Sequence, residues 1–366
     1  MTVYIVDIEA VDTRYTKQWK EYLPKQLKHA GLDVSVISGG DVPQATTPGA
    51  FLNFAGTNNY KSQQMLQISE MFAKGIVKNG DYFLYTDAWN PTVIQLRYMA
   101  ELLGVDIRIG GLWHAGSYDP QDFLGRLIGD KPWVRRAEQS MYYTYDNNFF
   151  ASDFHIEMFM RTLLNEYSNE NPWIEEDVEE ALAGKEPCIT RVGWPMEYLK
   201  DSLDSYKGMP KRDLILFPHR IAPEKQPEIF RDLKESLPEY EFVICQEQEL
   251  TKNEYHNLLG EAKLVFSANL QETLGISWYE GALVGALPMV PDRLSYAEMA
   301  LFEFKYPSEW TEDFAAYKAN KDKVIAQIQD YMENYETYLV ALDKQKTKLN
   351  KDYFSGAALY DAIKGQ

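Results

Sequence analysis

The chain has 366 residues and a formal net charge of -18, and 45% of its residues are hydrophobic. A single hydrophobic core usually stops growing below this length, so the chain is expected to fold as two domains. The acidic balance disfavours a protein whose main partner is nucleic acid, because phosphate contacts need a basic surface. The two cysteines, Cys188 and Cys245, are far apart in sequence, which excludes a zinc-finger spacing and a disulfide framework.

The N-terminal sequence has neither the basic region nor the apolar core of a signal peptide. No apolar run approaches the length of a membrane-spanning helix. These features predict a cytoplasmic protein without a transmembrane segment. The oligomeric state is left open by the sequence.

The N-terminal half alternates predicted strands and helices. Short β-branched apolar runs predict strands, and the amphipathic segments between them predict helices. Such alternation with short links is typical of a parallel sheet with crossover helices, so a doubly wound α/β domain is expected. The predicted strands cover residues 3–8, 32–38, 81–86 and 106–112, and the predicted helices cover 15–29, 62–79 and 92–103.

Two polar loops in this half are candidate walls of a ligand site. Residues 39–41 (GGD) follow the second predicted strand, and residues 53–59 (NFAGTNN) precede a predicted helix. Ligands in doubly wound folds bind outside the carboxyl ends of the strands. The alternative interpretation is that both loops are simple turns.

The second half repeats the alternation, and a helical, lysine-rich stretch follows from about residue 312 to 364. A strongly acidic segment over residues 166–187 indicates a domain boundary. The sequence therefore predicts an N-terminal domain over 1–187, a C-terminal domain over 188–330, and a C-terminal helix over 331–366 that packs back on the N-terminal domain. The predicted strands of the second half cover 214–217, 241–245, 264–267 and 287–290, and its helices 224–235, 252–262 and 277–284.

Two glutamates, Glu272 and Glu280, flank a turn and the start of a predicted helix. Backbone N–H groups at a helix N-terminus form a ready anion site. Glu280 would lie about one turn inside this helix, where its carboxylate could accept hydrogen bonds from a ribose diol. Glu272, on the loop, would face the other end of the ligand. The alternative interpretation is that both glutamates are solvated.

A basic pair, Arg220 and Lys225, connects a predicted strand to a predicted helix. Arginine offers a planar fork and lysine a point charge, a common combination on phosphates. Together with the helix start near Thr273, the pair predicts a diphosphate held from two sides. His219 is expected only to position Arg220.

This pattern resembles retaining glycosyltransferases of the GT-B fold, in particular glycosyltransferase family 4. That family has an arginine and a lysine after the first strand of the C-terminal domain, followed by a Glu-x7-Glu motif. The resemblance is specific over about residues 187–292 and architectural over the N-terminal half. It implies two Rossmann-like doubly wound domains that face an interdomain cleft. The matching residues are Arg220, Lys225, Glu272, Gly275, Glu280 and Gly285.

Two positions depart from the family pattern. Gln226 stands where the family usually has a glycine. Thr273, Leu274 and Gly275 replace the Gly-Phe-Gly that often follows the first glutamate, so Thr273 is expected to adopt a backbone conformation that glycine usually takes.

The resemblance implies a hexosyl- or pentosyltransferase that uses a nucleotide-diphosphate sugar. Arg220 and Lys225 would neutralise the leaving diphosphate, which is the main catalytic contribution. Glu272 would hold sugar hydroxyls and Glu280 the ribose. The turn would complete the donor site through Thr273, Leu274, Gly275 and Ile276. Enzymes of this fold need no metal or other cofactor, and the chain lacks the Asp-x-Asp motif of the metal-dependent alternative fold.

The N-terminal domain is expected to hold the acceptor. His114 follows a predicted strand and is a candidate catalytic residue that touches the sugar or the acceptor. Asp87 follows another and could bind acceptor hydroxyls or act as a base. Trp113 is a candidate stacking surface. The alternative interpretations are a satisfied structural histidine and a helix cap at Asp87.

The acceptor hydroxyl could belong to a modified nucleobase in DNA, a glycan or a lipid, and the net charge disfavours DNA. Fold does not settle reaction type, so two alternatives stand beside the transferase. One is a non-catalytic nucleotide-sugar-binding protein and the other is a sugar-nucleotide epimerase of the same fold.

Overall fold

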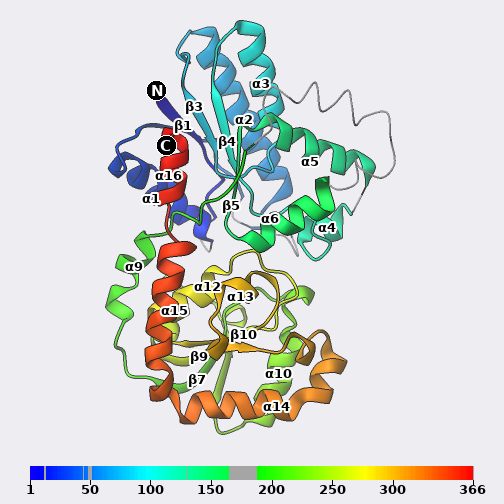
Figure 1. The fold of residues 1–366 in the computed structure, drawn as a ribbon, viewed down its shortest axis with the longest axis vertical. Coiled ribbons are helices and arrows are strands. Elements are labelled where there is room, and N and C mark those ends of the chain that lie inside the picture. The colour runs from blue at the N-terminus through cyan, green and yellow to red at the C-terminus, as the bar shows by residue number, and fades with distance from the viewer. Residues whose placement is uncertain (12–13, 44, 48–51, 130, 165–187, 366) are drawn as a thin grey trace. The chain divides into compact units, whose positions relative to one another are not determined.

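The computed structural model describes residues 1–11, 14–43, 45–47, 52–129, 131–164 and 188–365. The chain divides into two compact units. The N-terminal unit comprises Met1–Pro195 with Gly356–Gln366, and the C-terminal unit comprises Met196–Ser355. Each unit is built on one parallel sheet with helices packed around it (Figure 1). The predicted fold class, α/β with two Rossmann-like doubly wound domains, is confirmed.

The N-terminal unit has a six-stranded sheet with the order β2-β1-β3-β4-β5-β6. All neighbouring strands run parallel. Because β1 lies between β2 and β3, the strand order reverses between β1 and β3, and doubly wound folds bind ligands outside the carboxyl ends of the strands at such a point. The strands are β1 (Thr2–Val6), β2 (Asp33–Ile37), β3 (Tyr82–Tyr85), β4 (Arg108–Leu112), β5 (Asn147–Phe150) and β6 (Cys188–Arg191).

The helices of this unit cover the sheet and enclose a core to which the inner strands β1, β3, β4 and β5 contribute mostly buried residues, whereas the edge strands β2 and β6 are largely exposed or half-buried. The helices predicted over 15–29 and 92–103 are present with those bounds. The sequence analysis missed β5, β6 and three of the helices. The helices are α1 (Tyr15–His29), α2 (Phe54–Ala73), α3 (Thr92–Leu103), α4 (Phe123–Leu127), α5 (Pro132–Thr144), α6 (Asp153–Phe159) and α16 (Ala357–Lys364), and a π-helix spans Met160–Leu164.

The prediction of a polar loop over 53–59 is wrong, because α2 already begins at Phe54. The Asn53 side chain accepts a hydrogen bond from Gly56 N at 2.9 Å and so caps the helix. At the other end α2 stops at Ala73, short of the predicted residue 79, since Gly75 adopts the left-handed conformation with φ 62°. The acidic segment over 166–187 lies outside the described residues.

The C-terminal unit has a five-stranded parallel sheet with the order β11-β10-β9-β7-β8. Its strands are β7 (Arg212–Phe217), β8 (Glu241–Ile244), β9 (Ala262–Phe266), β10 (Leu287–Pro291) and β11 (Lys305–Tyr306). The helices are α9 (Tyr198–Ser202), α10 (Pro227–Ser236), α11 (Lys252–Glu261), α12 (Ile276–Leu283), α13 (Leu294–Met299), α14 (Phe314–Glu333) and α15 (Leu339–Asp352). The central strands are buried on both faces, as expected for a parallel sheet.

The division between the units differs from the predicted boundaries. Since β6 pairs with β5, the segment Cys188–Arg191 belongs to the N-terminal unit, and the division falls after Pro195 instead of after residue 187. The segment predicted as a C-terminal helix over 331–366 is shared between the two units. Its helix α15 packs against α12 within the C-terminal unit. Only α16 belongs to the N-terminal unit, where Arg108 Nη2 donates to the Ile363 carbonyl at 2.7 Å.

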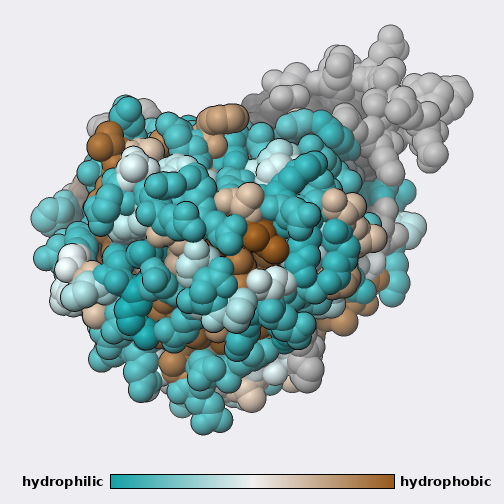
Figure 2. Space-filling model, turned by 90° about the horizontal axis from the view of Figure 1, so that it is seen from below, coloured by the Kyte–Doolittle hydropathy of each residue, from teal (hydrophilic) through white to brown (hydrophobic). Residues whose placement is uncertain are grey.

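The face drawn in Figure 2 is mostly hydrophilic, with small scattered hydrophobic patches. None of the helices in the described parts of the chain is long and apolar enough to cross a membrane. Both cysteines are free thiols, and Cys188 is exposed whereas Cys245 is buried.

Candidate functional site

Two loops meet at the carboxyl edge of the C-terminal sheet. One follows β7 and carries Arg220 and Lys225, and the other follows β9 and carries Glu272. Because β7 and β9 are parallel neighbours, both loops leave the sheet at the same edge. A hydrogen bond of 2.8 Å from Leu270 N to the Glu224 carbonyl joins them. The residues predicted from separate segments are therefore brought together.

Lys225 and Glu272 form a partly buried ion pair. The Nζ of Lys225 lies 3.4 Å from Oε2 of Glu272 and also donates to the backbone carbonyl of Gln271. Lys225 is 6% exposed. Burial lowers the pKa of the Lys225 ammonium, and the neighbouring Glu272 carboxylate opposes that shift. The charge of this buried ammonium is balanced by the Glu272 carboxylate and by the backbone carbonyl of Gln271.

Arg220 is held by a glutamate that the sequence analysis did not single out. Its Nε donates to Oε1 of Glu224 at 2.8 Å, and its Nη2 donates to the same oxygen. Glu224 is 1% exposed, so a buried carboxylate fixes the position of the Arg220 guanidinium. The four-residue spacing between Arg220 and Glu224 was the available signal. The neighbouring His219 is buried, and burial lowers its pKa to about 3, so the imidazole is neutral at pH 7.

Gln226, which departs from the family pattern, adopts the left-handed conformation with φ 50°. This explains why glycine is favoured there. The glutamine side chain offsets the strain, because its Nε2 donates to the carbonyls of Ala268 and Thr311, both at 2.7 Å. Arg293 Nη2 donates to the same two carbonyls at 2.9 and 3.1 Å. The two side chains thus fasten the loop that carries Glu272.

The turn before α12 places its left-handed residue at Gly275, with φ 83°. A Cβ at this position would lie 2.5 Å from Cδ1 of Trp278, so a glycine is required. The prediction that Thr273 adopts a glycine-like conformation is wrong, because only Gln226 and Leu294 have positive φ among the described non-glycine residues. The remaining predicted turn residues differ in exposure: Leu274 is buried, whereas Thr273 and Ile276 are half-buried.

Glu280 is a buried carboxylate in α12 with three partners on α11. Tyr255 donates its hydroxyl to Oε2 at 2.9 Å, and Lys252 Nζ lies 3.3 Å and His256 Nε2 3.9 Å from Oε1. Burial alone would raise its pKa, but Lys252, His256 and Tyr255 outweigh burial and lower the pKa to about 2. The predicted ribose-binding group is therefore ionised and positioned by α11. Sequence reasoning missed these partners, since they lie in another helix.

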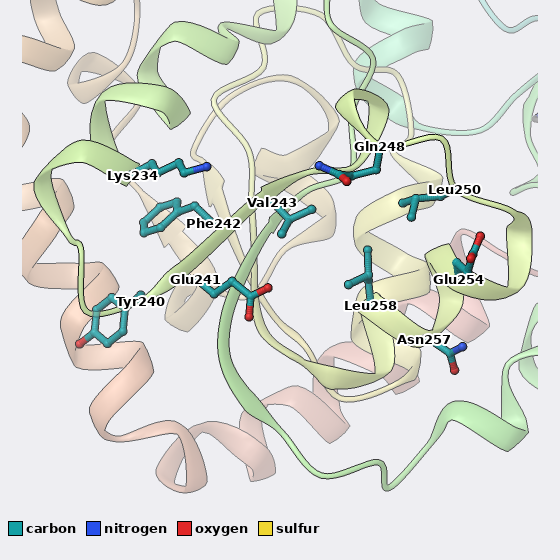
Figure 3. A pocket seen from close by; sticks show the side chains of 10 residues that line it. All are labelled: Lys234, Tyr240, Glu241, Phe242, Val243, Gln248, Leu250, Glu254, Asn257 and Leu258. Carbon is teal, nitrogen blue, oxygen red and sulfur yellow. The ribbon is translucent and has the colours of Figure 1, made fainter.

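An open groove of about 700 Å³ lies along the edge strand β8, beside α10 and α11 (Figure 3). None of the predicted donor-site residues lines it. The groove is lined by Lys234, Tyr240, Glu241, Phe242, Val243, Gln248, Leu250, Glu254, Asn257 and Leu258. It is therefore separate from the edge where Lys225 and Glu272 meet.

In the N-terminal unit, His114 has both ring nitrogens engaged. Nδ1 lies 2.9 Å from the Tyr15 hydroxyl and Nε2 lies 2.7 Å from the Thr86 carbonyl. The carbonyl can only accept, so Nε2 carries the proton and Nδ1 accepts from Tyr15. Trp19 and Trp194 pack against the ring, and burial lowers its pKa. This geometry favours the structural interpretation of His114.

Asp87 does not cap a helix, since Pro91 occupies the N-cap position of α3. Its Oδ2 pairs with Lys61 Nζ at 3.0 Å, and its Oδ1 accepts from Trp89 N at 3.2 Å. The Asp87 side chain is 15% exposed, so it can contact a ligand.

Trp113 has no exposed surface and lies in the core of the N-terminal unit. Its Nε1 donates to Asn148 Oδ1 at 2.8 Å. A stacking residue needs an exposed ring face, which Trp113 does not present in this structure. No group of histidine, cysteine, aspartate or glutamate side chains suited to a metal ion occurs in the part of the chain that the structure describes.

No protein-family model matches the chain, and no curated protein matches it in sequence. Solved structures match over its whole length. The catalytic domain of starch synthase IV from Arabidopsis thaliana, bound to ADP and acarbose, has a TM-score of 0.60 and 11% identity, covering 100% of this chain and 99% of that one. Sucrose-phosphate synthase from Thermosynechococcus elongatus has a TM-score of 0.58 and 11% identity, with 100% and 98% covered.

A third similar structure is the lipopolysaccharide outer core galactosyltransferase WaaB, with a TM-score of 0.53 and 10% identity, covering 100% of this chain and 99% of that one. At such low identities the similarity establishes the fold alone. The chain has the GT-B fold of glycosyltransferases.

Proposed function

We propose that the chain is a retaining glycosyltransferase that moves a hexosyl or pentosyl group from a nucleotide-diphosphate sugar to a hydroxyl acceptor. The observation that carries the proposal is the meeting of Arg220, Lys225 and Glu272 at the carboxyl edge of the C-terminal sheet. Two adjacent cations and a carboxylate suit a diphosphate joined to a sugar. The ADP in the starch synthase structure supports a nucleotide as the ligand of this fold.

The ion pairs suggest how the donor would bind. Lys225 Nζ would exchange the Glu272 carboxylate for a phosphate oxygen, which leaves Glu272 to accept hydrogen bonds from sugar hydroxyls. Arg220 would contact the diphosphate while Glu224 keeps its guanidinium in place. As the bond from the sugar to the phosphate oxygen breaks, negative charge grows on the leaving group and these cations stabilise it.

The remaining donor contacts follow from the resemblance to glycosyltransferase family 4. Glu280 would accept hydrogen bonds from the ribose, with Tyr255 orienting its carboxylate. The turn of Thr273, Leu274, Gly275 and Ile276 would contact the sugar or phosphate at the start of α12. The two cations serve in place of a divalent metal, so we propose a metal-independent reaction.

The first test is a panel of nucleotide-diphosphate sugars, scored by thermal shift and by release of the nucleoside diphosphate. We expect at least one donor to stabilise the protein and to be turned over with EDTA present. Arg220→Gln and Lys225→Met should each lower kcat by about 10²- to 10³-fold, the usual effect of removing one transition-state donor. Arg212→Gln is the matched control, because Arg212 pairs with Glu241 at the amino end of β7 and is 46% exposed.

The outcomes separate the candidate functions. Stabilisation without turnover would favour a nucleotide-sugar-binding protein, and conversion of the donor without release of nucleoside diphosphate would favour an epimerase. An acceptor product with the inverted anomeric configuration, measured by NMR, would overturn the retaining assignment. If no donor stabilises the protein, or if both variants behave like the wild type, the transferase proposal is lost.

A further inference from the structure

Charged side chains with no role in the donor chemistry cluster at the carboxyl ends of β1 and β3. Asp7 and Glu9 follow β1, Asp87 follows β3, and Lys61 reaches them from α2. Strands β1 and β3 flank the point where the sheet order reverses, which is where doubly wound folds bind ligands. The inference below rests on the proposed transferase function and concerns the acceptor.

Glu9 is a buried carboxyl for which the described residues offer no partner in good hydrogen-bond geometry, the Thr57 hydroxyl being near it. It is 2% exposed, and neither Oε1 nor Oε2 has a partner within hydrogen-bond geometry. The nearest groups that favour its charged form are Thr57 and Lys61, but burial dominates and raises the pKa of Glu9. Buried polar groups are nearly always paired in folded proteins, so a bare carboxyl at a ligand-binding edge needs an explanation.

The neighbouring Asp7 shows what a structural acid looks like in the same cluster. Its Oδ1 accepts from the Tyr60 hydroxyl at 2.5 Å and from Gln64 Nε2 at 3.0 Å. Its Oδ2 accepts from Ser38 Oγ at 2.5 Å. Asp7 is therefore fully used in holding β1, β2 and α2 together, whereas Glu9 has no such task.

Lys61, Asp87 and Trp89 form the outer part of the cluster. Lys61 Nζ donates to Asp87 Oδ2 at 3.0 Å and to the Trp89 carbonyl at 2.7 Å, and it lies 5.3 Å from the centre of the Trp89 ring. Lys61 is buried, whereas Asp87 and Trp89 are half-buried. The indole is fixed in place, because its Nε1 donates to Glu138 Oε1 at 2.8 Å. The cluster thus combines a rigid aromatic face, two carboxyls and one ammonium.

The charges of the cluster select the class of acceptor. The acids Asp7, Glu9, Asp87 and Glu138 outnumber the bases Lys20 and Lys61, and burial raises the pKa of Asp7, Glu9 and Glu138, so the cluster is rich in carboxyl groups and poor in cations. Lys20 and Lys61 are already paired with Asp7 and Asp87, so the cluster offers little to a phosphorylated acceptor or a nucleic-acid backbone. Sugar hydroxyls are good donors to carboxylates, and a sugar ring presents an apolar C–H face to an indole.

We propose that Glu9, Lys61, Asp87 and Trp89 form the acceptor site and that the acceptor is an uncharged carbohydrate. One acceptor hydroxyl donates to the Glu9 carboxyl and so supplies the hydrogen bond that this group lacks in the protein. Asp87 and Lys61 bind a second hydroxyl, and Trp89 packs against the ring. Glu9 and Lys61 are binding residues that the sequence analysis did not identify.

The test measures acceptor binding without any donor. Saturation-transfer NMR with the methyl glycosides of glucose, galactose, mannose and N-acetylglucosamine, each in both anomers, should show binding of at least one to the full-length chain. Glu9→Gln and Lys61→Met should each weaken that binding at least tenfold. Asp81→Asn is the matched control, because Asp81 is equally buried but lies at the amino end of β3, where it accepts from Thr2 N and Lys78 N.

The binding experiment has outcomes that would overturn the proposed acceptor site or its carbohydrate class. Equal binding by the wild type and Glu9→Gln, or no binding of any glycoside up to about 50 mM, overturns the proposal. Binding of a hydroxymethylcytosine-containing oligonucleotide in place of the glycosides, abolished in Glu9→Gln, overturns the carbohydrate class. Because no donor is present, failure here is distinct from failure of the nucleotide-sugar panel, which probes Arg220 and Lys225.

Discussion

Glu9 and Glu280 are glutamates of the two units that are about equally buried, with exposed fractions of 2% and 4%. Their surroundings differ completely. Glu280 has Lys252, Tyr255 and His256 as partners, and its pKa falls to about 2. The carboxyl oxygens of Glu9 have no partner in good hydrogen-bond geometry within the part of the chain that the structure describes, and burial raises its pKa. Both carboxyls are buried, so the difference in the direction of their pKa shifts comes from their partners.

The difference extends to the charged groups around each glutamate. In the C-terminal unit the cations of the candidate donor site each have a carboxylate neighbour, Glu224 for Arg220 and Glu272 for Lys225. A site balanced in this way can receive an anionic ligand by exchange of partners. In the N-terminal unit the acids outnumber the bases near Glu9, which suits a neutral ligand with hydroxyl donors.

The largest expected effect on stability is that of Glu280→Gln. The shift of the Glu280 pKa from its usual 4.5 to about 2 corresponds to about 3 kcal/mol of stability at pH 7. The amide cannot attract Lys252, so chemical denaturation at pH 7 should show a loss of that size. Glu247→Gln, which removes an exposed partner of Arg231, should change stability by less than about 1 kcal/mol.

The pH dependence gives the sign of this effect. Because the pKa of Glu280 is lower in the folded state, the stabilisation is present above pH 4.5 and is lost as the pH falls toward 2. The stability curves of the wild type and Glu280→Gln should therefore converge over that range. If the two stability curves stayed parallel over this range, Lys252, Tyr255 and His256 would not be what lowers the pKa of Glu280, and its pKa would no longer distinguish it from Glu9.

The sequence analysis was correct for helices whose ends are determined by residues close in sequence. The helix over 92–103 ends where Gly104 adopts φ 64°, a capping signal visible in the sequence. The start of α2 was misplaced, since a polar run that resembles a loop is held in the helix by the Asn53 cap. The short strands β5 and β6 were missed because their pairing is determined by tertiary contacts.

The candidate site divides in the same way. The positions of Arg220, Lys225 and Glu272 follow from strand order, since loops after parallel strands share one edge. The partners of Glu280 come from α11, and no sequence pattern links the two helices. Trp113 was predicted to stack on the acceptor although its ring lies in the core, and Glu9 was overlooked although the described residues give its carboxyl no partner in good hydrogen-bond geometry. Whether a side chain is buried and paired depends on segments distant in sequence.

Substitutions at Gln226 test how much the two buried hydrogen bonds of this neutral side chain stabilise the fold. Gln226→Ala removes two hydrogen bonds but keeps a left-handed residue with a Cβ, so we expect a loss of about 2 kcal/mol. Gln226→Gly relieves the backbone strain and should lose only about 1 kcal/mol. The measurement is urea denaturation of the three proteins. Equal losses for alanine and glycine would mean that the backbone at φ 50° is unstrained.

The smallest expected effect, and the only gain, is that of Glu9→Gln. Because the pKa of Glu9 is raised in the folded state, its ionisation destabilises the fold as the pH rises through that raised value, and no penalty exists below 4.5. The amide cannot ionise, so the variant should be more stable than the wild type at pH 7 and equal to it at pH 4. A destabilised variant would show that Glu9 has a structural partner, and the contrast with Glu280 would fail. A stabilised variant that has lost glycoside binding would identify Glu9 as a residue kept for function at a cost in stability.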